Sequence, residues 1–431
     1  MGTDGLRLGI VGLGTVGAGV VKLLDDNRDL VAARAGRPIE IVAVNARERG
    51  KDRGVDLSGY RWQDDAAAMT EADDIDVVVE LVGGSDGLAL TLARKALAAG
   101  KGFVTANKAM IAHHAQELSA LAESASAPLK FEAAVAGGIP VIKGLGGGAA
   151  ANEITHLFGI LNGTCNYILS EMETDGAPFA DVLRAAQALG YAEADPTFDI
   201  DGIDAAHKLA ILASLVYGAR IDFGHVHTRG IREIEAIDIA RAAALGYRVR
   251  LVGEAAIEDG KLLQRVHPVL VPLSHPLAKV AGSTNAVVAE GNFVGRLTFE
   301  GAGAGAGPTA SAVVADIIDI ARGERTPPFG VPSAQLREIG PAQPDQGQGR
   351  SYIRVAVADQ PGVMADLTAI LRDAGVSIES LIQEGNDDEE DSVFIAMITH
   401  KGDESAVAEA CHEMANLPAV LGKPMRMDII D

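Results

Sequence analysis

The chain of 431 residues is too long for one ordinary domain, so we expect two or three domains. Its hydrophobic fraction of 48% and charged fraction of 22% are typical of globular proteins with sizeable cores. The formal net charge of −22 argues against nucleic acid as a partner, because a phosphate-binding surface needs a basic stripe.

Neither a disulfide framework nor a membrane segment is expected. Only Cys165 and Cys411 are available for disulfide formation. No apolar run reaches the roughly 18 residues that a membrane span requires. The opening stretch MGTDGLRLGIVGLG lacks a basic region followed by an apolar signal core. We therefore expect a soluble, cytoplasmic protein without a membrane partner.

The first third of the chain alternates apolar runs with helical segments. We expect strands at LRLGIV (6–11), IEIVAV (39–44), IDVVVELVGG (75–84), GFVTANK (102–108) and LKFEAAVAGG (129–138). Near-continuous Val and Ile runs between amphipathic helices indicate a parallel sheet that is covered on both faces. The pattern predicts an α/β domain of the Rossmann type.

A glycine motif follows the first expected strand directly. Gly12, Gly14 and Gly17 spell G-x-G-x-x-G, and the helical pattern that follows places pyrophosphate at a helix N-terminus. The expected cofactor-binding loop comprises Gly12, Leu13, Gly14, Thr15, Val16 and Gly17. A bare strand–helix turn is the structural alternative.

The end of the second expected strand bears on the choice of cofactor. It carries Asn45 instead of an acid, and Arg47 and Arg49 follow. A neutral residue with nearby arginines suits the 2′-phosphate of NADP, so NADP is favoured over NAD. The alternative is that these arginines are merely solvated.

Beyond Pro140 the pattern changes. RVRLVGEAAI, LLQRVHPVLV and AVVAEGNFVGRLTFEG suggest a second, α+β domain with its own sheet. Residues 338–350 are rich in Pro, Gly and Gln and are expected to form a linker. Residues 351–431 then follow a βαββαβ order, which is typical of a ferredoxin-like domain. The acidic run EGNDDEEDS (384–392) within it is expected to be solvated.

The stretch GYAEADPTFDIDGIDAAHK (190–208) gathers five carboxylates next to one lysine. Asp204 and Lys208 are four residues apart and would share one helix face. The apolar run LAILASLVYG places Lys208 at the margin of a buried segment, where a lysine beside a carboxylate can carry a proton. The residues alone leave catalysis and a structural ion pair open.

Taken together, these motifs are recognisable. The region 6–322 resembles homoserine dehydrogenase, and the tail with ADQPGVMADL (358–367) resembles an ACT domain. The motifs that carry the first resemblance are GLGTVG, ANKA (106–109), FEAAVAGGIPVI (131–142), LNGTCNYIL (161–169), the acidic stretch and GAGAGAGPTASAVVADI (301–317).

The resemblance implies a reversible hydride transfer between L-aspartate 4-semialdehyde and L-homoserine. Lys208 is implied as the proton donor, with Lys108 beside it and near the cofactor. The implied substrate-binding residues are Glu193, Asp199, Asp204, Thr164 and Gly163. An ordinary turn is the alternative for the Asn162–Thr164 segment.

Further sites are also implied by the resemblance. Gly307 is expected at a helix start near the cofactor, and a monovalent cation, usually sodium, near the domain junction. The residues implied for the cation, mostly through backbone oxygens, are Glu132, Val135, Gly137 and Ile139. In the tail, Asp359, Pro361 and Gly362 are implied in binding threonine. An ACT domain kept for oligomerisation alone is the alternative.

We expect three domains and an assembly that is a homodimer or a homotetramer. The predicted bounds are 1–140 for the Rossmann domain, rejoined by 308–335, 141–307 for the substrate and dimerisation domain, 336–350 for the linker and 351–431 for the ACT domain. Two other readings stay open: another two-domain NAD(P)-dependent dehydrogenase of a sugar or hydroxy acid, and a non-catalytic amino-acid sensor that binds nucleotide.

Overall fold

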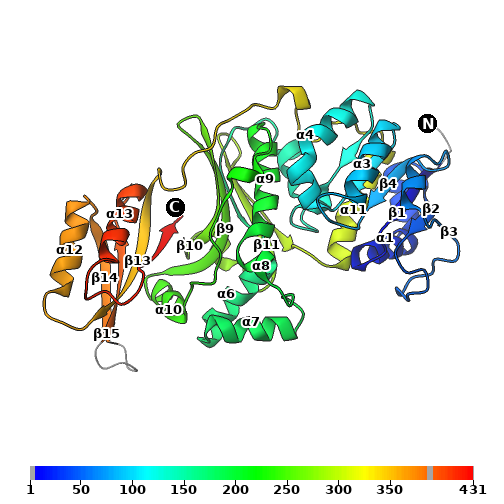
Figure 1. Ribbon diagram of the computed structural model, residues 1–431. Coiled ribbons are helices and arrows are strands. Elements are labelled where there is room, and N and C mark those ends of the chain that lie inside the picture. Colours follow the sequence, from blue (N-terminus) through cyan, green and yellow to red (C-terminus); the bar gives the residue numbers. More distant parts are fainter. Residues whose placement is uncertain (1–4, 386–391, 431) are drawn as a thin grey trace. The chain divides into compact units, whose positions relative to one another are not determined.

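The computed structural model describes residues 5–385 and 392–430 (Figure 1). The chain divides into two compact units. Unit 1 comprises 1–163, 204–226 and 284–339, and unit 2 comprises 164–203, 227–283 and 340–431. Most of the acidic run 384–392 lies outside the described residues. Among the helices of the described residues, none has the length and apolar character that crossing a bilayer requires.

Unit 1 contains the expected parallel sheet. Its six strands lie in the order β3-β2-β1-β4-β5-β6, so the strand order reverses between β1 and β4. The carboxyl ends of strands at such a switch point form the usual ligand crevice of open α/β sheets. The bounds are β1 (Leu6–Val11), β2 (Ile39–Asn45), β3 (Arg61–Trp62), β4 (Val77–Glu80), β5 (Gly102–Thr105) and β6 (Leu129–Lys130).

Helices cover this sheet and bury its Val and Ile side chains. One pair that packs together is α1 (Thr15–Asp26) with α11 (Ala306–Ala321), and another is α3 (Leu88–Ala98) with α4 (Lys108–Ser124) (Figure 1). A shorter helix, α2 (Arg28–Ala35), also contacts α11. Helix α11 comes from a segment far along the chain, and Val313 and Ile317 within it are fully buried in the same core as Leu8 and Ile10.

The remainder of unit 1 combines a small sheet with a buried helix. Strands β7 (Ile154–Ile160), β11 (Thr284–Gly291) and β12 (Gly295–Ala302) are antiparallel, with β11 in the middle. Helix α9 (Ile203–Tyr217) begins one residue after Gly202 and is buried along almost its whole length. The short turn of α5 (Val141–Lys143) follows Pro140. These elements carry the conspicuous motifs of the middle of the chain.

Unit 2 is built around one continuous sheet. A long hairpin, β9 (Tyr247–Glu258) and β10 (Lys261–Pro272), is joined by the C-terminal strands in the order β10-β17-β13-β15-β14. The short strand β8 (His227–Thr228) pairs with β10. The other helices of this unit are α6 (Gly163–Asp175), α7 (Phe179–Ala188), α8 (Thr197–Ile200) and α10 (Ala236–Ala244).

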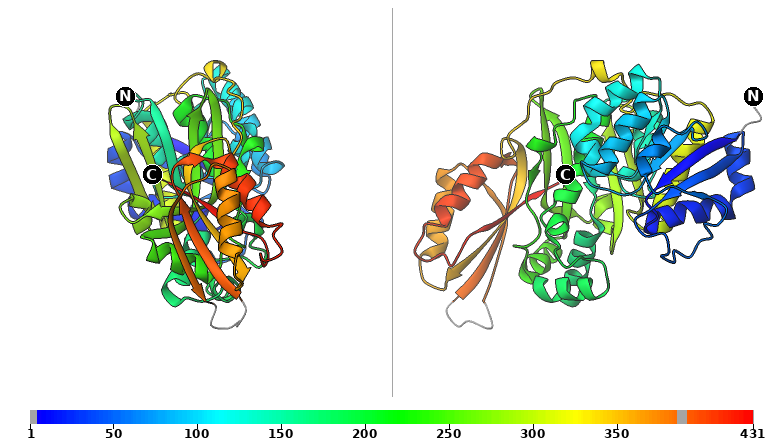
Figure 2. Two further views of the ribbon diagram at one scale, coloured as in Figure 1. Left: turned by 90° about the vertical axis from the view of Figure 1, so that its left-hand side faces the viewer. Right: turned by 45° about the vertical axis from the view of Figure 1, so that its right-hand side comes forward.

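The C-terminal domain has the predicted βαββαβ order. Both of its helices lie on one face of its sheet, with Val363 and Leu367 from the first and Val407 and Met414 from the second in the core (Figure 2). A two-residue strand, β16 (Gly402–Asp403), pairs with β13. The elements are β13 (Gln348–Ala358), α12 (Val363–Asp373), β14 (Ile378–Gly385), β15 (Ser392–Thr399), α13 (Glu404–Met414) and β17 (Met425–Ile429).

The expected linker is partly tied to the sheet. Leu262 on β10 donates its backbone N–H to the Gly340 carbonyl at 2.9 Å and accepts one from Ala342 at 3.0 Å. Strand β13 already begins at Gln348, inside the predicted linker. Composition indicated a flexible segment because Pro, Gly and Gln have no apolar period, but backbone pairing needs no apolar side chains. The domain bounds otherwise remain predictions.

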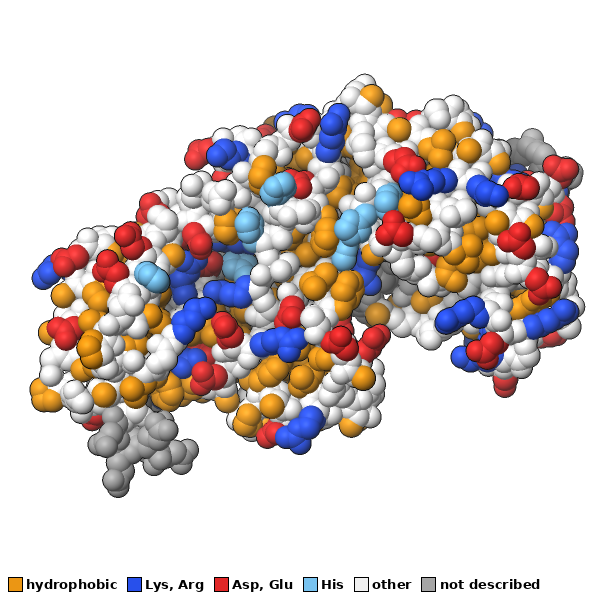
Figure 3. Space-filling view, viewed as in Figure 1, with side chains coloured by type: hydrophobic (Ala, Val, Ile, Leu, Met, Phe, Trp, Pro, Cys, Tyr) orange, Lys and Arg blue, Asp and Glu red, His pale blue; other side chains and the backbone are white. Residues whose placement is uncertain are grey.

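Charge on the surface agrees with the composition. Among the described residues on the face shown in Figure 3, acidic and basic side chains are interspersed over both units. A continuous basic stripe is the feature that a nucleic-acid partner would require.

Candidate active site

The three glycines of the N-terminal loop each have a distinct physical role. Gly12 has φ +98°, and a Cβ there would lie 2.6 Å from the Leu81 carbonyl oxygen. A Cβ at Gly17 would lie 2.0 Å from the Gly12 oxygen, so helix α1 could not approach the strand. At Gly14 a Cβ would meet nothing within 4 Å, which leaves open space beside the N-terminus of α1. These residues fit a dinucleotide, whose pyrophosphate needs that space.

Strand β2 ends in Asn45 and not in an acidic residue. The Asn45 side chain donates to the carbonyls of Gln63 at 2.8 Å and Asp64 at 3.2 Å, so its amide fixes the neighbouring loop. Arg47 is exposed. Arg53, which the sequence did not point to, donates its Nε to the Leu13 carbonyl at 3.0 Å and thereby braces the glycine loop.

A buried carboxylate shapes the loop after β4. Glu80 is fully buried and accepts hydrogen bonds from the backbone N–H groups of Val82 at 2.7 Å and Gly83 at 2.9 Å. It also accepts one from the Thr105 hydroxyl at 2.6 Å, which links β4 to β5. The sequence did not point to Glu80, because its side-chain partner Thr105 lies on another strand.

The ANKA motif starts helix α4. Asn107 caps this helix, its Oδ1 accepting from the Met110 N–H at 3.1 Å. Its Nδ2 donates to the Gly84 carbonyl at 2.6 Å, so the cap also holds the loop after β4. Lys108 is the first residue of α4, and its position is fixed by this cap.

The carboxylate of Asp204 lies between two lysines. Its Oδ2 accepts from Lys208 Nζ at 2.7 Å, and its Oδ1 lies 3.0 Å from Lys108 Nζ. Asn162 Nδ2 also donates to Asp204 Oδ2, at 2.9 Å. Lys208 makes a further hydrogen bond to the Leu161 carbonyl at 2.7 Å. Segments from three parts of the chain thus converge on one buried carboxylate.

The electrostatics of this cluster favour an anion beside the lysines. Burial alone would raise the pKa of Asp204, but the charges of Lys208 and Lys108 outweigh it and hold that pKa below its usual range. Asp204 therefore stays ionised near neutral pH. The two ammonium groups beside this carboxylate are suited to stabilising an oxyanion.

Three of the predicted substrate residues belong to unit 2. Thr164 donates its hydroxyl to the Tyr191 carbonyl at 2.8 Å, and the Asp199 carbonyl accepts from the Cys165 thiol at 3.2 Å. The side chain of Glu193 is exposed. The structure thus brings together Lys208, Lys108 and Asp204, with Gly163 directly after Asn162. The substrate roles of Glu193, Asp199, Thr164 and Gly163 remain predictions.

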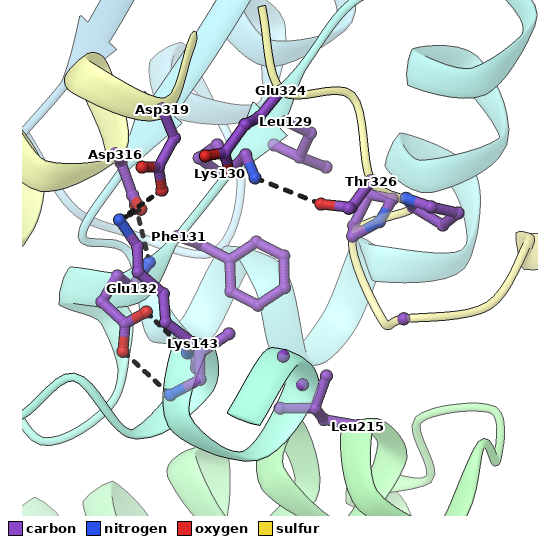
Figure 4. Close-up of a pocket in the computed structure, with 16 residues that line it drawn as sticks. Leu129, Lys130, Phe131, Glu132, Lys143, Leu215, Asp316, Asp319, Glu324 and Thr326 are labelled. Atoms are coloured by element: carbon purple, nitrogen blue, oxygen red, sulfur yellow. Dashed lines mark hydrogen bonds and ion pairs between the residues drawn. The ribbon is translucent and has the colours of Figure 1, made fainter. Parts of the chain in front are cut away.

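A second charged cluster surrounds Glu132, beside a cavity of about 360 Å³ (Figure 4). The Glu132 carboxylate accepts from the N–H groups of Ile142 at 2.8 Å and Lys143 at 2.9 Å. Lys143 Nζ lies 3.1 Å from an oxygen of Asp316 and 2.5 Å from one of Asp319. Burial and the charge of Asp316 raise the pKa of Glu132 to about 7, although two backbone hydrogen bonds oppose this shift.

This geometry bears on the predicted cation segment. Each oxygen of the Glu132 carboxylate accepts one backbone hydrogen bond, and the backbone oxygens of the segment are further hard ligands. Gly137 has φ +53°, and a Cβ there would lie 2.4 Å from the Gly303 oxygen. The Ile139 oxygen accepts from the Val141 N–H at 2.8 Å. In the described part of the chain no three His, Cys, Asp or Glu side chains form a metal-binding group. The cation site predicted at Glu132, Val135, Gly137 and Ile139 remains a prediction.

The other predicted positions lie at helix starts. Gly307 is in the first turn of α11, where a Cβ would meet nothing within 4 Å. Gly362 has φ +99° and directly precedes α12. Asp359 and Pro361, in the same loop, are exposed. Their roles in binding also remain predictions.

Comparisons with known proteins agree with this geometry. Family models match at 12–132 (homoserine dehydrogenase, NAD binding domain), 140–318 (homoserine dehydrogenase) and 351–411 (ACT domain). The homoserine dehydrogenases of Pseudomonas aeruginosa and Neisseria gonorrhoeae are 42% and 43% identical, with 98% of each chain covered. The crystal structure of a homoserine dehydrogenase from Thiobacillus denitrificans is similar with a TM-score of 0.93, at 41% identity and 99% coverage of both chains.

Neither of the two other readings is favoured by these matches. A sugar or hydroxy-acid dehydrogenase, or a non-catalytic sensor, would not be expected to resemble homoserine dehydrogenases along the full chain. The chain therefore belongs to the homoserine dehydrogenase family of oxidoreductases and carries a C-terminal ACT domain.

Proposed function

We propose that this protein interconverts L-aspartate 4-semialdehyde and L-homoserine with NADP as its preferred cofactor and Lys208 as the proton carrier. The observation that supports the chemical roles is the buried Asp204 carboxylate between Lys208, at 2.7 Å, and Lys108, at 3.0 Å. A carboxylate held ionised in this position keeps both ammonium groups in place. Lys208 then has a proton to give and a neighbour that stabilises its charged form.

In the reductive direction the protein has to manage a growing negative charge. The nicotinamide, when bound, supplies the hydride to the carbonyl carbon of the semialdehyde. Lys208 donates a proton to the carbonyl oxygen as that oxygen becomes an alkoxide, and Lys108 stabilises the charge. The product is the alcohol, and in oxidation the neutral Lys208 amine accepts the hydroxyl proton.

Binding of the substrate involves the other acidic residues in this proposal. Glu193 and Asp199 bind the α-ammonium and the hydroxyl, and Thr164 and the backbone at Gly163 line the pocket. This assignment rests on the family resemblance and on the position of these residues in the acidic stretch and the NGT motif. Replacement of Glu193 by Gln should raise KM for homoserine more than it lowers kcat, whereas a larger effect on kcat would contradict a binding role.

The preference for NADP rests on the basic residues beyond β2. Arg47 is exposed where the ribose end of the cofactor is expected, and no acid ends the strand. A hyperthermophilic archaeal homoserine dehydrogenase, 27% identical and covering 73% of this chain, was solved in complex with NADPH.

The cofactor preference can be tested by homoserine oxidation with NADP and with NAD. Arg47→Ala should raise KM for NADP by about tenfold, the value of one charge-assisted contact, and leave NAD unaffected. Arg28→Ala, an exposed arginine at the start of α2, is the matched control. Equal losses for both cofactors would contradict a role in binding the 2′-phosphate.

The cation, the effector and the assembly complete the proposal. Sodium binds to backbone oxygens of the Glu132–Ile139 segment, threonine binds at the Asp359–Gly362 loop, and the chain forms a homodimer or homotetramer. Activity in sodium chloride against tetramethylammonium chloride tests the cation, and analytical ultracentrifugation tests the assembly.

The threonine site is best tested by a point substitution. Deletion of the C-terminal domain would remove β17 from its partner β10 and expose that strand's edge. Asp359→Ala leaves the sheet intact and should weaken inhibition by threonine, with kcat unchanged in its absence. Unchanged inhibition would contradict binding at this loop.

A further inference from the structure

A second cavity, of about 340 Å³, lies within unit 2 and is not lined by any residue assigned to catalysis, cofactor, cation or threonine. Its lining residues come from the segment after β8, from the predicted linker (336–350), and from α13 and β17 of the ACT domain. The charged residues that line the cavity are Arg229, Glu233, Asp345, Lys423 and Arg426, together with His412.

Arg229 is the unusual member of this group. Burial lowers the pKa of its guanidinium, so the charge is held in a poorly solvated position. The charges of Asp428, Glu233 and Asp345 oppose this shift and the charge of Arg426 adds to it. Arg229 takes part in none of the ion pairs found among the described residues. The residue is only partly buried and lines the cavity, and guanidinium groups are well suited to bidentate recognition of oxyanions.

The other charged side chains of the cavity form no ion pair with Arg229. They are paired with one another or are exposed. Arg426 is paired with Asp345 at 2.5 Å and with Asp428 at 3.3 Å, and its buried Nε has no partner. Lys423 and Glu233 are both exposed. The cavity therefore presents Arg229 and Lys423 as its available cations, above an apolar wall that includes Ala408, Pro424 and Met425.

We propose that this cavity binds a small anion, a phosphate or a carboxylate group, with Arg229 as its principal ligand and Lys423 as a second one. A bound oxyanion supplies the hydrogen-bond acceptor that Arg229 lacks, and charge-assisted bonds of this kind are strong. Because the ligand touches both the segment after β8 and the ACT domain, its binding also stabilises the attachment of β17 to β10. The site is independent of the proposed active site.

The test uses the full-length protein saturated with NADP, so that the glycine loop cannot bind the probe. Isothermal titration calorimetry with inorganic phosphate and, separately, with acetate is carried out at constant ionic strength. We expect saturable binding of at least one probe, weakened about tenfold by Arg229→Gln. The control Arg372→Gln removes an exposed arginine of α12 and should change nothing.

Folding of the variant is checked in the same experiment. Without added anion, Arg229→Gln should melt at or above the temperature of the unchanged protein, because the charge that it removes has no ion-pair partner. Lys423→Gln, at an exposed position, should weaken binding in the same direction but by less. Crystals soaked in selenate should show an anomalous peak at Arg229.

The outcomes separate the ligand classes. Binding of phosphate alone indicates a phosphate-bearing ligand, and binding of acetate alone indicates a carboxylate. The proposal is overturned if neither probe binds saturably, or if Arg229→Gln and Lys423→Gln both bind the probe as tightly as the unchanged protein.

Discussion

Each unit contains a cluster of ion pairs, and the two clusters differ in their numbers of cationic and anionic side chains. In unit 1, two lysines share one carboxylate, Asp204. In unit 2, Arg265 contacts three carboxylates, Glu254 at 2.7 Å, Glu404 at 2.8 Å and Asp428 at 3.4 Å. Asp204 and Lys208 are as buried as Arg265, so burial alone does not distinguish the proposed catalytic cluster from a structural one.

The difference between the two clusters lies in the type of cation. Arg265 remains protonated at every accessible pH, and the pKa of Glu254 is held at about 2 by the charge of Arg265 despite burial. The Arg265 guanidinium therefore does not exchange its proton near neutral pH, and its contacts connect β9 and β10 to α13 and β17. Lys208 can release a proton, and Lys108 in the same cluster is about one-third exposed. We propose that a lysine beside the carboxylate, in place of an arginine, distinguishes the site of chemistry from the structural cluster.

The largest effect is expected for Lys208→Ala. Loss of the proton donor should lower kcat by about 10³-fold, within the range for general acid–base catalysis. Steady-state kinetics measures the loss, and NADP binding, followed by fluorescence titration, should be preserved. Lys22→Ala is a matched control, since Lys22 makes the same i,i+4 ion pair with Asp26 but is exposed. Full turnover by Lys208→Ala would remove the distinction between the two clusters.

Glu404→Ala should break the cluster in unit 2 instead. Removal of one partner from a buried ion network costs about 3–5 kcal/mol in the free energy of unfolding. Thermal and denaturant unfolding should show this loss, while kcat at low temperature stays near that of the unchanged protein. Glu413→Ala, at an exposed position of the same helix, should have little effect. A lower kcat with unchanged stability would contradict the account, because it would place the chemistry in the cluster of unit 2.

Glu132→Gln should change the pH dependence of stability. The folded pKa of Glu132 is raised to about 7, so the folded state binds a proton that the unfolded chain has already released. The stabilisation that comes from this bound proton is fully present at low pH. It is lost as the pH rises from the ordinary carboxyl range through 7. The unchanged protein should therefore lose stability relative to Glu132→Gln by at most about 1.4 kcal/mol per pH unit across that window. Parallel melting curves at all pH values would contradict the shift.

Much of the fold was predictable because its signals are local. The glycine loop, the helix over Asp204 and Lys208 and the βαββαβ order of the tail depend on residues close in sequence. The ion pair between Asp204 and Lys208 follows from helical spacing alone. Near-continuous Val and Ile runs likewise predicted the parallel sheet.

The parts that were missed depend on contacts between distant segments. Arg53 reaches Leu13 across 40 residues, and Arg265 reaches Glu404 across 139 residues. Nothing in the neighbourhood of either arginine in sequence indicates its partner. The hydrogen bonds of the Glu132 carboxylate to the N–H groups of Ile142 and Lys143 were also missed, since the sequence does not reveal which N–H groups a carboxylate will meet.

The central claim is that Lys208 transfers a proton and does not only supply charge. Its most direct test is rescue of Lys208→Ala by small cations, measured as the rate of homoserine oxidation with NADP. Ethylammonium and guanidinium carry the same charge, but only the first exchanges its proton readily near neutral pH. The account predicts that ethylamine restores turnover in a saturable manner and guanidine does not. Equal rescue by guanidine would show that charge alone is sufficient and would contradict it.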